Sequence, residues 1–572
     1  MQVRLRSLDD RLVGRISSTL RVRPATARCL VARGVTEPCE AQGFIDPRLA
    51  ALRPPAGLAG MALAVGRIAD AVQAGERIGV FGDYDVDGVT TAALLTSFLR
   101  ASGAHVEPAV ARRDAGYGFT TDAAADFARR GCKLVVTGDC GTNDLDAIYA
   151  GAALGVEVIV VDHHTVPPAD VAHPAFALVN PFRKDSTFPF RGMASVGLMF
   201  YVAASVRTEL RDRGWYRSRP EPDVRDLLDL VALGTVADLV PLAAENRILT
   251  SLGLRRLQSR ARPGIAALLA SAGVDDDRTI DAHTIAWKLA PRINAPGRLG
   301  AAEPSLALLL ADAESAPARA AALEDANTER RAIQDRVMDE VMARLDAQGS
   351  DPGAAIVIAG EGWPTGVVGI IASKLVDKFH RPAFVIGLDP IAGIGRGSAR
   401  TVPGVNLYEA LTKAAPHLQR YGGHAAAAGF TIALDNVPAL ADTLSDVCAK
   451  LAEGSGPVPT HLDVDAEVSL DEIDERLAEE LTGLGPFGQN NPAPLLVTRG
   501  AKVTAARRVG DGSHLKLTIE DHHTTRTAIG FGLGERPVDV GANLDLAFVP
   551  RISTWQGRRS AELEVSDLAI LP

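Results

Sequence analysis

The sequence predicts an α/β protein with two αβ domains joined by a long helix, followed by a β-rich C-terminal domain. In the first half of the chain and again after residue 350, short apolar runs alternate with segments whose apolar residues have helical spacing. The segment between these regions is rich in Ala, Leu, Glu and Arg, which favours helix. Near the C-terminus, closely spaced β-like runs are separated by turns, as in a small β-barrel or sandwich.

The first αβ domain is expected over residues 76–300. Its first strand is RIGVF at 77–81, a helical pattern follows at 89–102, and strands and helices then alternate as far as VEVIVVD at 156–162. Strands alternating with helices of this length predict βαβ crossovers and a mostly parallel sheet. Residues 1–75 contain short helical pieces broken by prolines, and we expect them to pack on this domain as a lead-in.

The rest of the chain divides into three further segments. Connecting helices are predicted over 301–350, and the smaller αβ domain over 351–455 contains the strand-like runs AAIVIAG and PAFVIG. Residues 456–572 form the β-rich domain, in which runs such as HLKLTIED alternate apolar and polar residues. Within it, Asp521-His522-His523 lies between two such runs and is predicted to be a polar hairpin turn.

Composition excludes several classes of protein. A net charge of −10 argues against a uniformly basic nucleic-acid coat, although it allows a local basic groove. No apolar run approaches the roughly 20 residues of a membrane span, and the N-terminus lacks a signal-peptide pattern, so we expect a cytoplasmic protein without membrane contact. The five cysteines are scattered without metal-site spacing and are expected to be small core residues.

Acidic side chains follow the first predicted strand. The segment FGDYDVDG puts Asp83, Asp85 and Asp87 at alternate positions directly after it. A calcium-binding EF-hand loop is one alternative, but its twelfth position is Leu94 instead of a glutamate, and the segment follows a strand instead of a helix. A solvated turn is the other alternative for this segment taken alone.

Further acidic and imidazole groups follow later strands. Asp139 comes after KLVVTG, the triplet Asp162-His163-His164 comes after VEVIVV, and Asp238 interrupts the apolar segment VALGTVADLVPL. Each has a plain structural alternative as a helix cap, a salt-bridge partner or a buried histidine. In an open parallel sheet, however, the carboxyl ends of the strands share one edge, where ligands bind.

Carboxylates gathered at one edge would repel one another and raise one another's pKa unless cations neutralise them. Oxygen ligands with one imidazole suit manganese or magnesium better than zinc. Two such ions about 3.5 to 4 Å apart can activate a water and stabilise the leaving oxygen of a phosphodiester. The sequence therefore predicts a metal centre at the sheet edge.

The segments GDYDVDG, TGDCG, VVDHH and GTVADLVPL resemble, in order and spacing, the four motifs of the DHH phosphoesterase superfamily. The resemblance runs over nearly the whole chain and includes PRINAPGRLG, GIGRGSARTVPGVNL, YGGHAAAAGF and PFGQNNPAP. It implies that the three predicted domains are a DHH domain, a DHHA1 domain and an OB-fold. The metal ligands that it implies, with Asp139 bridging two Mn²⁺ or Mg²⁺ ions, are Asp85, Asp87, Asp139, His163 and Asp238.

The resemblance also implies which residues act on the substrate. Asp83, Asp162 and His164 would support catalysis, with His164 touching the scissile phosphate. Independently of the resemblance, glycine N–H groups and guanidinium groups in GIGRGSAR suit phosphate oxygens. The residues implied to bind nucleic acid are Arg112, Tyr117, Arg292, Arg298, Arg396, Ser398, Arg400 and His424.

Three positions depart from the pattern of the superfamily. Phe81 stands where related sequences often have a histidine, which leaves the first ion to rely on carboxylate or water. Pro364 follows Trp363 where a histidine is common, and Asn490 stands where glycine is frequent. None of these departures removes a core motif residue.

The resemblance implies a monomeric 5′-to-3′ exonuclease that releases 5′-mononucleotides from single-stranded DNA. It further implies work in recombination and repair with a single-strand binding protein and a RecQ-like helicase. One alternative is a small-substrate phosphoesterase that cleaves short oligonucleotides or cyclic dinucleotides, which the β-rich C-terminal domain disfavours. The other is a non-catalytic replication scaffold, which is disfavoured because every metal-ligand position is filled.

Overall fold

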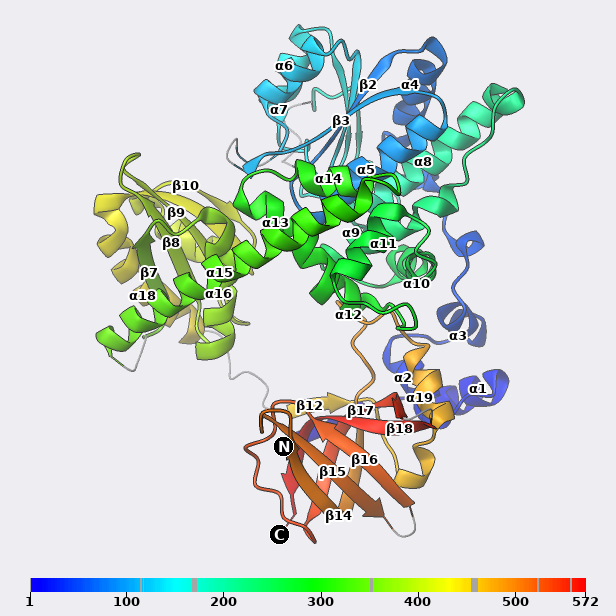
Figure 1. The fold of residues 1–572 in the computed structure, drawn as a ribbon, viewed down its shortest axis with the longest axis vertical. Coiled ribbons are helices and arrows are strands. Elements are labelled where there is room, and N and C mark those ends of the chain that lie inside the picture. The colour runs from blue at the N-terminus through cyan, green and yellow to red at the C-terminus, as the bar shows by residue number, and fades with distance from the viewer. Residues whose placement is uncertain are drawn as a thin grey trace.

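The structure is a computed structural model that describes residues 2–113, 116, 118–166, 172–349, 353–453, 461–521, 524–555 and 558–571. Three bodies are visible in it (Figure 1). A long helix connects the parallel-sheet domain to the second αβ domain, and the C-terminal barrel lies beside the N-terminal helices (Figure 1). This arrangement confirms the predicted fold class.

The first domain is built on a five-stranded parallel sheet in the order β3-β2-β4-β5-β6. Because β2 lies between β3 and β4, the chain winds in both directions from β2, and a topological switch point lies beside it. The strands are β2 (Arg77–Gly82), β3 (His105–Val110), β4 (Leu134–Gly138), β5 (Glu157–Val161) and β6 (Ala177–Val179).

Helices cover both faces of this sheet, and each face has its own core. Val80 and Val136 face one core and Val135 and Val158 face the other, as the two-residue periodicity of strands requires. The first core includes α4 (Met61–Ala74), α5 (Val86–Ala101) and α8 (Ser195–Asp212), and the second includes α6 (Thr121–Arg129) and α7 (Leu145–Ala153).

A helical region follows and leads to the second domain. Its last helix, α15 (Ala316–Gln348), has 33 residues and is the predicted connecting helix. Residues Ile285–Leu289 form a π-helix, η6, which runs directly into α13. The other helices are α9 (Leu228–Ala237), α10 (Ala244–Gln258), α11 (Pro263–Ser271), α12 (Ala282–Thr284), α13 (Ala290–Leu299) and α14 (Glu303–Leu309).

The second αβ domain has a mixed sheet in the order β10-β11-β9-β8-β7. Only β7 and β8 are parallel. The antiparallel strands were not predicted, because segments such as IGRGSAR lack apolar alternation. The elements are β7 (Ile356–Glu361), α16 (Thr365–Phe379), β8 (Ala383–Asp389), β9 (Ile394–Arg400), α17 (Leu407–Lys413), β10 (Leu418–Gly423), β11 (Ala427–Ala433) and α18 (Val437–Glu453).

The C-terminal domain is a closed five-stranded barrel, consistent with an OB-fold. Its strands pair in the order β14-β15-β16-β18-β17, and β14 pairs with β17 to close the ring. In the turn between β15 and β16, Asp521 pairs with Thr524, while His522 and His523 lie outside the described residues. The elements are β12 (His461–Val464), β13 (Ala466–Glu467), α19 (Glu475–Thr482), β14 (Leu496–Val509), β15 (His514–Asp521), β16 (Thr524–Gly530), β17 (Asn543–Trp555) and β18 (Arg558–Ile570).

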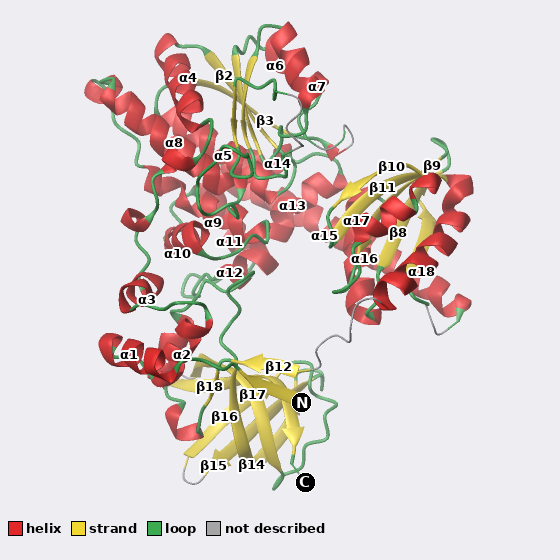
Figure 2. Ribbon diagram, turned by 180° about the vertical axis from the view of Figure 1, so that it is seen from behind, coloured by secondary structure: helices red, strands yellow, loops and turns green. Residues whose placement is uncertain are grey.

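The N-terminal residues pack differently from the prediction. Val13, Ile16 and Leu30 share a core with the barrel, and β1 pairs in parallel with β12, so the first part of the lead-in packs on the C-terminal domain (Figure 2). Only the later part, from about α4 onward, joins the core of the first domain. The segments are β1 (Gln2–Leu5), α1 (Asp10–Leu20), α2 (Pro24–Ala32) and α3 (Pro38–Ile45).

Two further expectations concern exposure. All five cysteines are free, as expected, but Cys39 is exposed instead of buried in a core. Within the described ranges, no single helix is both long and apolar enough to cross a membrane; one pair, bent by 97°, passes that test only when its two helices are taken together.

Candidate metal centre

The turn after β2 positions the first three aspartates. Asp85 is the N-cap of α5, and its carboxylate accepts a hydrogen bond of 3.1 Å from the Gly88 N–H. Asp87 follows in the first helical turn and is buried. Its carboxylate accepts hydrogen bonds from the backbone N–H groups of Ser195 (2.8 Å) and Val196 (3.0 Å), at the N-terminus of α8. Two helix N-termini therefore hold this part of the centre.

Asp139 follows β4 in a left-handed backbone conformation with φ of 62°. Its side chain is buried, and the Ser195 hydroxyl donates to its Oδ1 at 3.4 Å. Asp139 is not the N-cap of the next helix, which begins at Leu145. A non-glycine residue held at positive φ is costly, and such positions cluster at active sites.

His163 joins the aspartates from two directions. Its Nε2 lies 3.3 Å from Asp139 Oδ1 and 3.5 Å from Asp238 Oδ2. Asp238 is the C-cap residue directly after α9 and neither caps a helix N-terminus nor forms a salt bridge with a described arginine or lysine. Oδ2 of Asp238 is buried and accepts no hydrogen bond from the described part of the chain. An acceptor left in this state needs a cation or a proton.

Asp162 and His164 form a pair beside these residues. His164 Nδ1 lies 2.7 Å from Asp162 Oδ1, and the Thr142 N–H donates to the other carboxylate oxygen. Burial alone would raise the pKa of Asp162, but the hydrogen bond and the charge of His164 lower it. For His164, burial lowers the pKa, but the same hydrogen bond together with the charges of Asp162, Asp85 and Asp87 raises it on balance. The hydrogen bond therefore favours an ion pair between a protonated His164 imidazole and an ionised Asp162 carboxylate.

Three aspartates of the centre, Asp87, Asp139 and Asp238, have raised pKa values. Burial, followed by the charge of Asp85, raises the pKa of Asp87 to about 7 and that of Asp139 well above its usual range. Burial and the charge of Asp87 raise the pKa of Asp238 to about 9. Burial lowers the pKa of His163 to about 4, so this imidazole is neutral and able to bind a metal. Mutual repulsion of this kind is what bound cations relieve.

The residues fit divalent cations. Three groups each present ligand atoms within 4.8 Å of one another, and Asp139 belongs to two of them. These groups are Asp139 with His163 and His164, Asp87 with His163 and Asp238, and Asp83 with Asp85 and Asp139. Carboxylate oxygens predominate, as manganese and magnesium prefer. Phe81 supplies no ligand atom, since its ring packs edge-on against Phe119 at 5.1 Å between centroids.

Four arginines from four segments of the chain form a cluster, and Arg298 among them interacts with the charge of Asp85. Burial, followed by the positive charges of Arg113, Arg330 and Arg400, lowers the pKa of Arg298 to about 10, so the four guanidinium groups lie near one another. Arg298 donates to the Gly366 carbonyl at 3.0 Å, and Arg400 donates to the Ser398 hydroxyl at 3.1 Å. None of Arg298, Arg330 and Arg400 forms a salt bridge with a described carboxylate. Uncompensated guanidinium groups of this kind suit phosphate.

Other predicted substrate residues lie apart or are already engaged. Arg292 is buried and forms an ion pair with Glu324 of α15, which differs from the predicted free phosphate ligand. Arg396 and His424 are exposed on the second domain, His424 in the turn between β10 and β11. The remaining two are Arg112, whose backbone forms an isolated antiparallel β-bridge with Ala301, and Tyr117, which lies outside the described residues.

Several residues of the site were missed from the sequence. Arg330 donates to Asn327 and Gln334 on α15, and its Nε and the Asn327 Nδ2 are buried without a hydrogen-bond partner in the described chain. The polar run at the middle of an otherwise amphipathic helix was the available signal. Ser195 and Asn180 were also missed; Asn180 donates to the His164 carbonyl at 2.9 Å, and no sequence pattern distinguishes it.

The fold and the centre define a DHH phosphoesterase. The family model described as "DHH family, N-terminal domain" matches residues 77–235, and the one described as "DHHA1 domain" matches residues 351–450. A third, described as "RecJ OB domain", matches residues 464–567.

Relatives give the particular family. The chain is 34% identical to the single-stranded-DNA-specific exonuclease RecJ of Bacillus subtilis, over 98% of this chain and 70% of that protein. It is 33% identical to RecJ of Escherichia coli, over 95% of this chain and 96% of that protein. The crystal structure of Thermus thermophilus RecJ in complex with Mn²⁺ superimposes with a TM-score of 0.83 at 29% identity, covering 99% of this chain and 79% of that one. The chain belongs to the RecJ family.

Proposed function

We propose that the protein is a single-stranded-DNA-specific exonuclease that removes 5′-mononucleotides from the 5′ end and acts in DNA recombination and repair. One observation carries the proposal: a buried centre of aspartates and one neutral histidine faces guanidinium groups that lack carboxylate partners within the described residues. Such an arrangement suits a phosphodiester, whose oxygens meet cations on both sides. Homologues named single-stranded-DNA-specific exonuclease support the substrate.

The metal ligands are Asp85, Asp87, Asp139, His163 and Asp238. Asp139 belongs to two of the potential ligand groups, which supports a bridging position between two ions. Two Mn²⁺ or Mg²⁺ ions bound there would supply an activated water and stabilise the charge that develops on the phosphate and on the leaving 3′ oxygen. Crystal structures of Thermus thermophilus RecJ with Mn²⁺ and with Mg²⁺ support both ions as cofactors.

The side chains around the ligands orient the substrate. Asp162 holds His164 by a 2.7 Å hydrogen bond and favours the protonated form of its imidazole, from which Nε2 donates a charged hydrogen bond to the scissile phosphate. Asp83 is buried next to Asp85 and adds negative charge to one ligand group. Asp83 and Asp162 therefore support the reaction by shaping the site, while His164 contacts the substrate.

The arginines bind the backbone of the strand. Arg298 of α13 and Arg400 of β9 hold phosphates between the two αβ domains, and Ser398 orients Arg400 through its hydroxyl. Arg396 and His424 extend this surface over the second domain, and Arg112 and Tyr117 extend it along the first. Arg292 would contribute only after releasing Glu324.

The test uses single strands of the same sequence, labelled at the 5′ or the 3′ end, with Mn²⁺ present. The proposal expects immediate release of labelled mononucleotide from the 5′-labelled strand, gradual shortening of the 3′-labelled strand, and resistance of a blunt duplex. Asp139→Asn should lose this activity. Hydrolysis of only dinucleotides or cyclic dinucleotides would favour a small-substrate phosphoesterase, and full activity of Asp139→Asn would favour a non-catalytic centre with a contaminating nuclease.

The cellular setting follows from the same proposal. The enzyme would act in the cytoplasm as a monomer, on single strands supplied by a RecQ-like helicase and coated by a single-strand binding protein. The domain limits that we propose are 1–75, 76–300, 301–350, 351–455 and 456–572. Within them, the barrel would guide the single strand, because OB-folds hold single strands with basic and aromatic side chains.

A further inference from the structure

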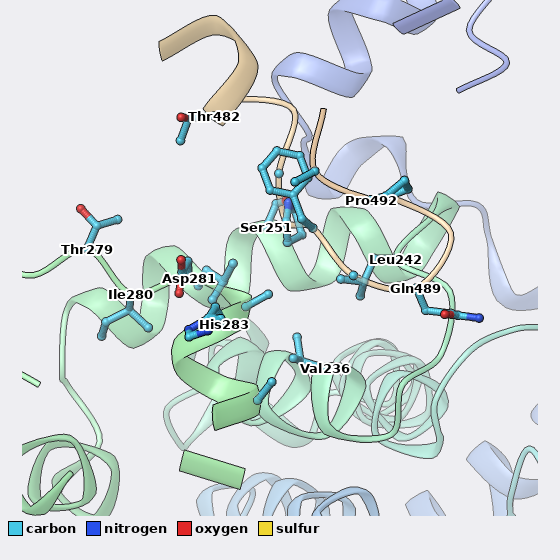
Figure 3. Close-up of a pocket in the computed structure, with 18 of the residues that line it drawn as sticks. Val236, Leu242, Ser251, Thr279, Ile280, Asp281, His283, Thr482, Gln489 and Pro492 are labelled. Carbon is cyan, nitrogen blue, oxygen red and sulfur yellow. The ribbon is translucent and has the colours of Figure 1, made fainter. Parts of the chain in front are cut away.

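A pocket of about 570 Å³ lies where the first αβ domain meets the segment that leads into the barrel. Residues from α9 and α10, from α12 and η6, and from the segment after α19 line it (Figure 3). The labelled side chains of Val236, His283 and Gln489 come from these three sources and surround the same space (Figure 3).

Two large apolar side chains are exposed in this pocket. Trp287 is 68% exposed and Leu239 is 73% exposed. Trp287 lies in the π-helix η6, and its ring is tilted by 33° against the ring of His283 at 6.0 Å between centroids. π-Helical turns are frequent at functional sites, and neighbouring exposed apolar groups mark binding surfaces. The partly buried Phe487 adds a third apolar wall.

Basic side chains edge the same pocket. Arg255 is exposed and makes no salt bridge with any residue that the structure describes. Arg551 of β17 is partly exposed and lies 3.2 Å from Glu564. The nearby carboxylate of Asp281 is occupied as the N-cap of α12, where it accepts hydrogen bonds from the N–H and hydroxyl of Thr284. The charged group that remains without a described counter-ion at the rim is therefore the Arg255 guanidinium, which is positive.

The pocket is lined by residues that neighbour a proposed metal ligand in the sequence. Leu239 directly follows Asp238, so their Cα atoms lie about 3.8 Å apart across one peptide bond. On its far side, the pocket reaches the segment before β14 and Arg551 of the barrel. A strand bound at the centre and continuing to the barrel would cross this surface.

We propose that the pocket is a subsite for a base of the single strand, stacked on Trp287, with the flanking phosphates directed to Arg255 and Arg551. The inference rests on the proposed function, since it concerns how the same strand continues beyond the metal centre. Aromatic faces combined with basic side chains bind single strands without regard to sequence, because every base has a stacking face. An acidic peptide is the other ligand that such a surface could accept, and the test separates the two.

The test measures binding of oligothymidylates without divalent ions, so that no turnover occurs. Strands of about 15 nucleotides should quench tryptophan fluorescence, while strands of about 4 nucleotides, too short to extend from the Arg298 and Arg400 region to the pocket, should give no such quench. Trp287→Phe should retain binding but lose the quench, although three other tryptophans remain. Trp287→Ala should bind the longer strand about tenfold more weakly, the factor that corresponds to ~1.4 kcal/mol of stacking.

A matched control is Tyr149→Ala, because Tyr149 of α7 is 53% exposed and does not line the pocket. With Mn²⁺, the ratio of kcat/KM for the longer strand to that for the shorter strand should fall about tenfold in Trp287→Ala and stay unchanged in the control. Equal effects of the two variants would overturn the inference, as would a quench produced by an acidic peptide but not by DNA. If the wild type fails to hydrolyse either strand, the proposed function is wrong; if it hydrolyses both and Trp287→Ala binds normally, only the subsite is wrong.

Discussion

Replacing Asp238 by asparagine removes one charge from the metal centre while keeping the shape of the side chain. Burial and the charge of Asp87 raise the pKa of Asp238 from 3.8 to about 9, so the metal-free fold binds a proton there that the unfolded chain releases. The fold is therefore fully stable below the unfolded pKa and loses stability as the pH rises towards 9. At about pH 8, roughly four units above the unfolded pKa at ~1.4 kcal/mol per unit, the cost is on the order of 5 kcal/mol.

Asparagine carries no such cost, although its amide needs partners in place of the proton. We expect the free energy of unfolding of the metal-free protein to rise by at least about 2 kcal/mol at about pH 8, which corresponds to about 4 to 8 °C in the Tm of a domain of this size. At about pH 4, close to the unfolded pKa, little of this cost remains, so the difference should nearly disappear. Differential scanning calorimetry in EDTA at these two pH values measures both.

Asp162→Asn is the matched contrast. The hydrogen bond from His164 lowers the pKa of Asp162 against the effect of burial, so this carboxylate contributes stability above its unfolded pKa that is lost as the pH falls. Its removal should destabilise the metal-free protein by about 3 to 5 kcal/mol at about pH 8. Both variants should lose more than about a hundredfold in kcat, because several kcal/mol of transition-state stabilisation depend on the centre. A metal-free Tm that falls in both variants would refute the reasoning.

Three further perturbations follow from the same geometry. Gly82→Ala should destabilise the first domain by at least about 1 to 3 kcal/mol, since a Cβ there would lie 2.1 Å from the Gly88 carbonyl oxygen. Thermal unfolding measures this loss of stability, and an unchanged Tm would contradict the packing of this turn. The Mn²⁺ affinity should rise from about pH 6 to about pH 9, because protons on Asp87 and Asp238, with pKa values of about 7 and about 9, compete with the ion. Isothermal titration calorimetry measures the affinity at each pH, and an affinity that does not change with pH would exclude this competition. Arg298→Ala should lower kcat/KM on single strands by about 10- to 100-fold, the value of a charged hydrogen bond to phosphate, and Arg298→Lys should recover part of it; equal activity of the alanine variant and the wild type would remove Arg298 from the substrate path.

Part of the fold could be predicted because it follows from local patterns. Continuous apolar runs ending in Asp83, Asp139 and Asp162 identify three buried parallel strands, and their alternation with helices puts those residues at one edge. The antiparallel half of the second domain could not be predicted, because β9 and β11 are rich in glycine and alanine. Their pairing is set by tertiary contacts that leave no periodicity in the sequence.

The packing of the N-terminal residues depended on contacts between distant parts of the chain. The helix α1 is amphipathic and requires an apolar partner, but its sequence does not say which domain supplies one. Pairing of β1 with β12 and the ion pair of Arg4 with Asp463 bring it to the barrel, more than 450 residues away. The N-terminal segment therefore packs on the C-terminal barrel before the chain enters the parallel-sheet domain, and it brings the two ends of the chain together.

The triplet Asp-His-His shows why position decides function more than residue identity. At residues 162–164 it follows a buried strand, where a buried carboxylate helps to raise the pKa of the second histidine while burial lowers the pKa of the first, which lies between Asp139 and Asp238. At residue 521 the same triplet begins at the end of a barrel strand, where the partly buried Asp521 pairs with Thr524. Opposite pKa shifts of adjacent histidines require burial and carboxylates at fixed places, which the edge of the parallel sheet provides.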